Sequence, residues 1–272
     1  TSMIDSGCRV AALQMISGAS LTDNLAAAAG LIADAAAQGA QLALLPEYFP
    51  LISAHDADKL AISESYGSGP IQAFLAEAAR THRMWIIGGT VPLATTDAHR
   101  LRNTCLVFDP EGACVARYDK LHLFSFQRGH ESYDEARLIE AGDELVSFDG
   151  PCGRIGLSVC YDLRFPEMYR RLGALNLIVV PAAFTDTTGR AHWELLLRAR
   201  AIENQCYVLA CGQGGLHPCG RRTFGHSMLI DPWGEVVVSL ALGAGVIAGD
   251  VDPARIRTVR ESLPALQHRR FT

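Results

Sequence analysis

Short apolar runs alternate with amphipathic segments along the whole chain, and this alternation limits the folds that the sequence can adopt. Apolar runs at 8–16, 41–45 and 84–91 predict strands, whereas residues 22–38 and the segment that Pro70 opens have the apolar spacing of helices. Strands that are regularly separated by helices are typical of layered α/β folds. The sequence therefore predicts an α/β protein.

The rest of the chain continues this pattern. Strands predicted at 103–109 and 113–118 flank Pro110, Glu111 and Gly112, which is a hairpin signal and predicts mixed rather than all-parallel sheets. Residues 121–143 are loop-rich. The remaining predicted elements are strands 153–160, 175–180, 206–211, 224–231, 235–239 and 244–250, and helices 165–172, 191–205 and 253–262. Because no linker-like stretch divides the chain, we expect a single domain over residues 1–272.

The first predicted helix has clear end signals. Thr22 is the predicted N-cap, Leu25, Ala28 and Ile32 share one face, and Gly39 stands just past the end.

Composition excludes several classes of function. A net charge of −5 and a pI near 6.0 argue against nucleic acid as a partner, because that binding depends on clustered cations. No apolar run approaches the roughly 20 residues that span a bilayer. The eight cysteines are irregularly spaced, with no C-x-x-C or H-E-x-x-H pattern. We expect free thiols, no metal, no cofactor, and a cytoplasmic location.

Two segments of the chain resemble each other. GAQLALLPEYF at 39–49 and GALNLIVVPAAF at 173–184 are both strand-like runs that end in proline, with phenylalanine three residues later. The residue after the proline is Glu47 in the first copy and Ala182 in the second. Either two similar strand ends exist and only one carries a carboxylate, or two apolar runs match by chance.

Lysine is scarce in this chain. Only Lys59 and Lys120 occur among the 24 basic residues, and all others are arginine. A retained lysine is therefore a candidate for a position where a compact amine is needed and a guanidinium would not serve.

Three polar residues follow predicted strands, where ligands gather in layered α/β proteins. Taken singly, Glu47 fits a solvated acid, Lys120 fits an exposed ion pair with Asp119, and Cys160 fits a small packed side chain. Together they make a catalytic set. Glu47 would take the thiol proton, Cys160 would attack an electrophilic carbon, and Lys120 with the Tyr161 N–H would stabilise the oxyanion. The product would be a thioester that water hydrolyses.

A histidine is the commoner base beside a catalytic cysteine. His122 lies two residues from Lys120 on the same predicted face, but no histidine follows a predicted strand directly. Glutamate is therefore preferred as the base.

LALLPEYF, YDKLHLF and GLSVCYDLRFPE resemble the three signature segments of the carbon–nitrogen hydrolase (nitrilase) superfamily. The resemblance implies an α-β-β-α sandwich with mixed sheets, in which Glu47 is the base, Lys120 the oxyanion-stabilising cation and Cys160 the nucleophile. It also implies a second glutamate after the lysine. Glu135 matches that position best, with Glu131 and Glu140 nearby.

The segments RAHWELLLRARAIENQCYVLA, RRTFGHSMLIDPWGEVV and LPALQHRR are similar to those of deaminated-glutathione amidases, and ω-amidases share much of this pattern. Both hydrolyse the ω-amide of an α-keto diacid, which gives α-ketoglutarate. The resemblance implies a small-molecule amide substrate, no cofactor, and a homodimer or larger oligomer. Alternatives are a nitrilase that forms a thioimidate and a non-catalytic interaction protein on the same fold.

Five further residues are predicted to bind substrate. By resemblance, Arg164 would hold the α-keto carboxylate, although a structural pair with Asp162 or Glu167 is an alternative. The opening of the same predicted pocket would be lined by Tyr48, Tyr161, Phe184 and Thr185. For the aromatic rings among them, packing in the core is the alternative.

Overall fold

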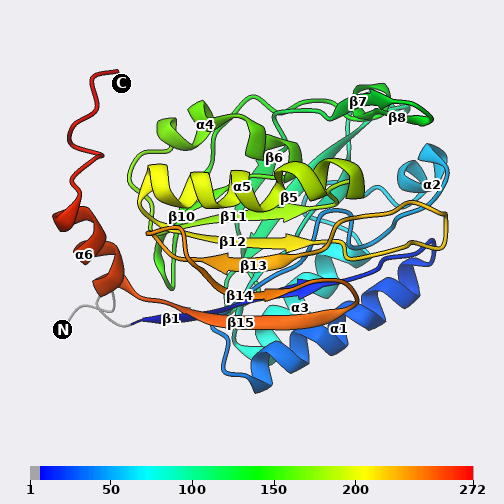
Figure 1. The fold of residues 1–272 in the computed structure, drawn as a ribbon. Helices are drawn as coiled ribbons and strands as arrows, with labels where there is room; N and C mark the ends of the chain where they lie inside the picture. The colour runs from blue at the N-terminus through cyan, green and yellow to red at the C-terminus, as the bar shows by residue number, and fades with distance from the viewer. Residues whose placement is uncertain (1–6, 272) are drawn as a thin grey trace.

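The computed structural model describes residues 7–271 as two packed sheets with helices outside both (Figure 1). In the first sheet the strands follow the order β15-β1-β2-β3-β5-β4, and β6 also pairs with β5. Its strands are β1 (Cys8–Gln14), β2 (Leu42–Leu44), β3 (Trp85–Ile87), β4 (Val91–Ala94), β5 (Leu101–Phe108), β6 (Cys114–Asp119) and β15 (Gly245–Val251).

The second sheet has the order β14-β13-β12-β11-β10-β9. Its strands are β9 (Ser147–Gly150), β10 (Gly153–Leu157), β11 (Leu177–Ala182), β12 (Tyr207–Gly212), β13 (Ser227–Ile230) and β14 (Val236–Leu240). In each sheet a central set of three strands is parallel and the flanking pairs are antiparallel. The predicted mixed sheets and the α-β-β-α sandwich are confirmed.

Helices cover both outer faces of the sandwich. The helices are α1 (Leu21–Ala37), α2 (Asp56–Ala61), α3 (Pro70–His82), α4 (Pro166–Arg171), α5 (Asp186–Asn204) and α6 (Pro253–Ser262). Figure 1 shows α4 and α5 above the second sheet and α1 and α3 below the first. None of the helices between residues 7 and 271 has both the length and the apolar character that a membrane span requires.

Alternation along β1 explains why its whole sequence is apolar. Val10 and Ala12 face the core between the sheets, whereas Ala11 and Leu13 belong to the core beneath α1 and α3. A strand that is covered on both faces has no solvated side, so it reads as a continuous apolar run.

The two similar segments occupy equivalent positions in the two sheets. β2 is the middle parallel strand of one sheet and β11 is the middle parallel strand of the other. Gly39 and Gly173, which precede them, both have φ of +80°. The two strand ends also meet, because the Ala183 N–H donates to Glu47 Oε2 over 2.8 Å.

Several predicted boundaries were wrong. The N-cap of α1 is Ser20, not Thr22, and its hydroxyl accepts from the Asp23 N–H. Helix α5 begins at Asp186 rather than 191, because Thr185 caps it through the Thr188 N–H.

The loop-rich segment 121–143 contains a hairpin, β7 (Ser125–Arg128) with β8 (Glu131–Asp134), followed by the short 3-10 helix η2 (Glu135–Arg137). The strand predicted over 153–160 stops at Leu157, and a 3-10 helix, η3 (Cys160–Arg164), begins at the cysteine. None of the eight cysteines, all within the described residues, forms a disulfide, which agrees with the free thiols predicted.

Candidate active site

The ends of three strands bring Glu47, Lys120 and Cys160 to one place. Glu47 lies just beyond β2, Lys120 directly follows β6, and Cys160 follows β10. Glu47 and Lys120 are 1% exposed and Cys160 is 8% exposed. Lys120 Nζ donates to Glu47 Oε1 over 2.9 Å. The ammonium is thus held inside the protein by an ion pair that solvent does not reach.

Glu135 is the second carboxylate on the lysine. Its Oε2 and Oε1 lie 2.8 and 3.0 Å from Lys120 Nζ. The Tyr48 hydroxyl donates to Glu135 Oε1 over 2.6 Å, and the Phe124 N–H donates to Oε2 over 2.7 Å. The two other glutamates considered for this position have different partners. Glu140 pairs with Arg102, and Glu131 accepts from the Thr187 hydroxyl.

Glu47 has its own set of donors, which the sequence did not reveal. Asn103 Nδ2 donates to Oε1 over 3.0 Å, and the Ala183 N–H donates to Oε2. Asn103 begins the apolar run NTCLVF and is buried in the structure. A polar amide in a run predicted to be a buried strand was the only sign in the sequence that it has a partner at the site. With Lys120, these donors fix both carboxylate oxygens.

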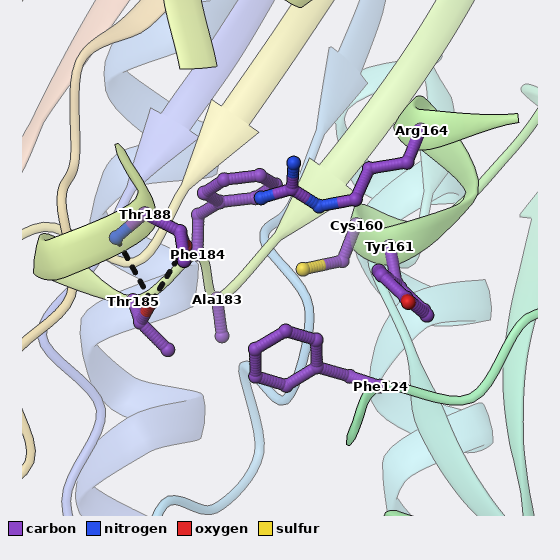
Figure 2. A pocket seen from close by; sticks show the side chains of 8 residues that line it. All are labelled: Phe124, Cys160, Tyr161, Arg164, Ala183, Phe184, Thr185 and Thr188. Atoms are coloured by element: carbon purple, nitrogen blue, oxygen red, sulfur yellow. Dashed lines mark hydrogen bonds between the residues drawn. The ribbon is translucent and has the colours of Figure 1, made fainter. Parts of the chain in front are cut away.

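Cys160 sits on a sharp turn that Asp162 maintains. The cysteine has φ of +48°, a conformation that costs a non-glycine residue roughly 1–3 kcal/mol. The buried Asp162 carboxylate accepts from the Val159 N–H over 2.8 Å and from the Tyr118 hydroxyl. The turn lifts the thiol out of the strand direction and into a cavity, where Figure 2 shows the sulfur pointing between Phe124 and Ala183.

Two alternatives raised by the sequence are wrong. His122 Nδ1 lies 2.7 Å from Asp162 Oδ1 and its ring stacks on Phe165, so His122 supports the turn and is not paired with the cysteine. Asp119 pairs with Arg117 and Arg102 rather than with Lys120.

The buried charges shift the pKa values of the site. Burial lowers the pKa of Lys120, but the carboxylates of Glu135 and Glu47 outweigh it and raise the net value. Burial raises the pKa of Glu135, but the ammonium and its hydrogen bonds outweigh it and lower the net value. Burial and the Glu47 carboxylate raise the pKa of the Cys160 thiol, and Lys120 opposes them incompletely. At neutral pH the ammonium is charged and the thiol keeps its proton.

Close backbone approaches require glycine at two places beside the site. A Cβ on Gly89 would lie 2.1 Å from the Pro46 carbonyl oxygen, next to Glu47. A Cβ on Gly142 would lie 2.2 Å from the Asp119 carbonyl oxygen, next to Lys120. Any side chain at either position would displace the backbone that carries a charged group of the site.

Cys160, Phe124 and Ala183 line two cavities at once. The smaller one is largely apolar and is also lined by Tyr161, Arg164, Phe184, Thr185 and Thr188 (Figure 2). The larger one is polar, about 600 Å³ in volume, and is bounded by α2, the β7–β8 hairpin and the loop that carries Arg221. The thiol therefore faces a junction between a narrow space and a wide one.

The structure places the five predicted substrate residues around this junction. Arg164 extends over the Phe184 ring, with its Nη1 3.2 Å from His192 Nδ1, and it pairs with neither Asp162 nor Glu167 (Figure 2). The Thr185 hydroxyl is engaged in capping α5. Tyr161 packs edge-on against Phe165, and Tyr48 holds Glu135. Only Arg164 among them offers a free charge to a ligand in the smaller cavity.

An α-β-β-α sandwich with a buried Glu–Lys pair and a cysteine on a turn defines a class of hydrolase. Known proteins that are similar to this chain in sequence and in structure belong to the same class. The model of the carbon–nitrogen hydrolase family matches residues 9–261. The chain belongs to this family, as its three signature segments predicted, and it is an amidase-type carbon–nitrogen hydrolase.

Its relatives include two kinds of amidase. Deaminated glutathione amidase of Yersinia enterocolitica is 41% identical over 267 residues, which cover 96% of this chain and 93% of the relative. Omega-amidase NIT2 of Homo sapiens is 35% identical over 266 residues, 96% of this chain and 95% of the relative. The crystal structure of Saccharomyces cerevisiae Nit3, a member of the nitrilase superfamily, matches with a TM-score of 0.88 at 27% identity and covers 100% of this chain and 99% of that one.

Proposed function

We propose that the protein hydrolyses the ω-amide of an α-keto acid of the deaminated-glutathione type through a thioester on Cys160. The observation that carries this proposal is the junction at Cys160, which lines both the narrow and the wide cavity, while the buried Glu47–Lys120–Glu135 cluster lines the wide one. The relatives named deaminated glutathione amidase support the substrate class.

In the first step, Cys160 Sγ attacks the amide carbon while Glu47 accepts the thiol proton. Because the thiol pKa is raised, proton transfer accompanies the attack rather than preceding it. The negative charge on the former carbonyl oxygen is stabilised by the Lys120 ammonium and the Tyr161 N–H. Glu135 holds Lys120 in position and does not exchange a proton.

In the second step, the tetrahedral species collapses, the C–N bond breaks, and Glu47 returns its proton to the leaving nitrogen. Water then attacks the thioester while Glu47 takes a proton from it. The C–S bond breaks, Glu47 returns that proton to the sulfur, and the acid leaves. No other group is required for the balance of atoms. The cluster thus serves both half-reactions.

An ω-amidase acting on α-ketoglutaramate is the second candidate, because relatives of that name are 35% identical along nearly the whole chain. Both substrates give the same acyl group on Cys160. Measuring α-ketoglutarate release from deaminated glutathione and from α-ketoglutaramate, with Cys160→Ala as control, distinguishes them. A higher kcat/KM for the peptide supports the proposal, and a higher value for the small amide replaces it with the second candidate.

A nitrilase activity is tested in the same assay with short-chain nitriles. We expect turnover of amides only. Turnover of nitriles above that of amides would overturn the proposed reaction type.

A further inference from the structure

The other lysine of the chain, Lys59, lines the wide cavity at Cys160, whereas Arg164 lines the narrow one. Lys59 is in α2 and lines the wide cavity, and its Nζ lies 4.2 Å from the centroid of the Tyr48 ring. Tyr48 is the residue that holds Glu135. Lys59 therefore contacts the Glu47–Lys120–Glu135 cluster only indirectly, through the side chain of Tyr48.

Arg221 lines the same cavity from a different segment. Its guanidinium lies over the Tyr133 ring at 5.6 Å, and its Nη2 donates to the Ala183 carbonyl over 3.0 Å. Its Nε is buried and has no hydrogen-bond partner in the structure. Since the Ala183 N–H also donates to Glu47, a single residue links the arginine to the carboxylate of the candidate active site.

Neither cation has a carboxylate partner within ion-pair distance among residues 7–271. The Glu47 and Glu135 carboxylates are already bound to Lys120, and Asp56 and Asp134 lie exposed at the rim. Burial and the nearby Arg221 charge lower the pKa of Lys59. Carboxylates also line this cavity, but none of them makes an ion pair with Lys59 or Arg221 among residues 7–271, so an anion that reaches both cations would gain two charge-assisted contacts.

We infer that Lys59 and Arg221 form a binding site for a carboxylate on the leaving amine of the substrate. This inference rests on the proposed function, and it deepens it by naming the two residues that would recognise the C-terminal carboxylate of the leaving peptide amine. Arg164 in the narrow cavity and the Lys59–Arg221 site in the wide cavity then hold the two ends of a dianionic substrate across Cys160.

The test uses two ligands that differ only at that carboxylate: deaminated glutathione and its C-terminal carboxamide. Binding of each is measured by calorimetry to Cys160→Ala, so the result does not depend on turnover. We expect the acid to bind about tenfold to a hundredfold more tightly than the carboxamide, as a charge-assisted hydrogen bond implies.

The same ratio is then measured with Lys59→Gln and with Arg221→Lys, each added to Cys160→Ala. Lys59→Gln should reduce the preference for the acid at least fivefold. Arg221→Lys keeps the positive charge but loses the two-donor geometry of the guanidinium. It should therefore reduce the preference for the acid over the carboxamide less than Lys59→Gln does. Arg154→Gln, at the far end of β10 from Cys160, is the charge-matched control and should leave the ratio as it was.

Equal binding of acid and carboxamide, no binding of either, or a ratio that Lys59→Gln does not change would overturn the inference. Failure of the proposed function looks different: the acid would bind with its preference intact, but the protein with Cys160 present would not hydrolyse it.

Discussion

The two lysines of the chain stand in opposite environments. Lys120 is fully buried and bonded to two carboxylates, which raise its pKa, whereas Lys59 is partly buried without an ion-pair partner, and its pKa is lowered. Two carboxylates fix the position of the first, and in the proposed mechanism its charge stabilises the oxyanion. The second keeps its charge available for a ligand. In the two proposals above, the buried, paired lysine serves the chemistry and the unpaired lysine serves recognition.

The largest effect is expected when Lys120 is removed. Lys120→Met would leave two carboxylates facing each other in the interior, so we expect a loss of about 3–5 kcal/mol of stability. It also removes an oxyanion donor, so kcat should fall about a hundredfold to a thousandfold. Urea unfolding and steady-state kinetics measure the two.

Lys120→Arg is the control for charge. It should regain part of the stability but little activity, because a guanidinium does not fit a site built around one nitrogen. Wild-type activity in Lys120→Met would mean that the buried cluster is structural only.

A smaller effect on recognition is expected at the narrow cavity. Arg164→Lys loses bidentate contact with a carboxylate, so KM for both keto acid amides should rise about tenfold. A neutral aliphatic amide serves as the control and should show a smaller change. An unchanged KM for the keto acids would remove Arg164 from carboxylate binding and leave only its packing on Phe184.

The pH dependence of stability tests the carboxylate side of the cluster. The folded-state pKa of Glu135 is lowered from its ordinary value of 4.5. Its contribution is therefore present above pH 4.5 and is lost as the pH falls through the lower folded-state pKa, with a slope of at most about 1.4 kcal/mol per pH unit. Glu135→Gln should unfold with a shallower loss of stability in acid than the wild type. An identical acid profile would contradict the pairing with Lys120.

The smallest effect is expected for the stability of Lys59 variants. Because the folded state disfavours the charge on Lys59, Lys59→Met should be neutral or stabilising, within roughly 0.5 kcal/mol. Thermal unfolding beside Lys120→Met gives the comparison directly. A loss comparable to that of Lys120→Met would show that Lys59 has a structural partner.

The strands and the catalytic set could be predicted from the sequence where a local pattern determines the structure. The strand ends that carry Glu47, Lys120 and Cys160 are marked by apolar runs, and the scarcity of lysine singled out both lysines. Predicted boundaries failed where a side chain decides them. The β10 strand stops before Cys160 because Asp162 binds the Val159 N–H, a contact that periodicity does not encode.

Contacts between distant segments were beyond sequence reasoning. Asn103 reaches Glu47 from β5 of the same sheet, and Ala183 reaches it from the end of β11 in the second sheet. Arg221 contacts Ala183 from the loop after β12, and none of the three lies in the three signature segments around Glu47, Lys120 and Cys160. The hairpin β7–β8 that walls the wide cavity has mostly polar residues and lacks the alternation that predicts strands. Oligomeric state and cytoplasmic location stay predictions.

The proposed thioester on Cys160 can be detected directly from the mass of the enzyme during turnover. Wild-type protein is mixed separately with deaminated glutathione and with α-ketoglutaramate, quenched in acid within milliseconds, digested and analysed by mass spectrometry. We expect one and the same α-ketoglutaryl adduct on the Cys160 peptide from both amides, and none in Cys160→Ala. Release of α-ketoglutarate by Cys160→Ala at the wild-type rate, or an adduct on another residue, would contradict it.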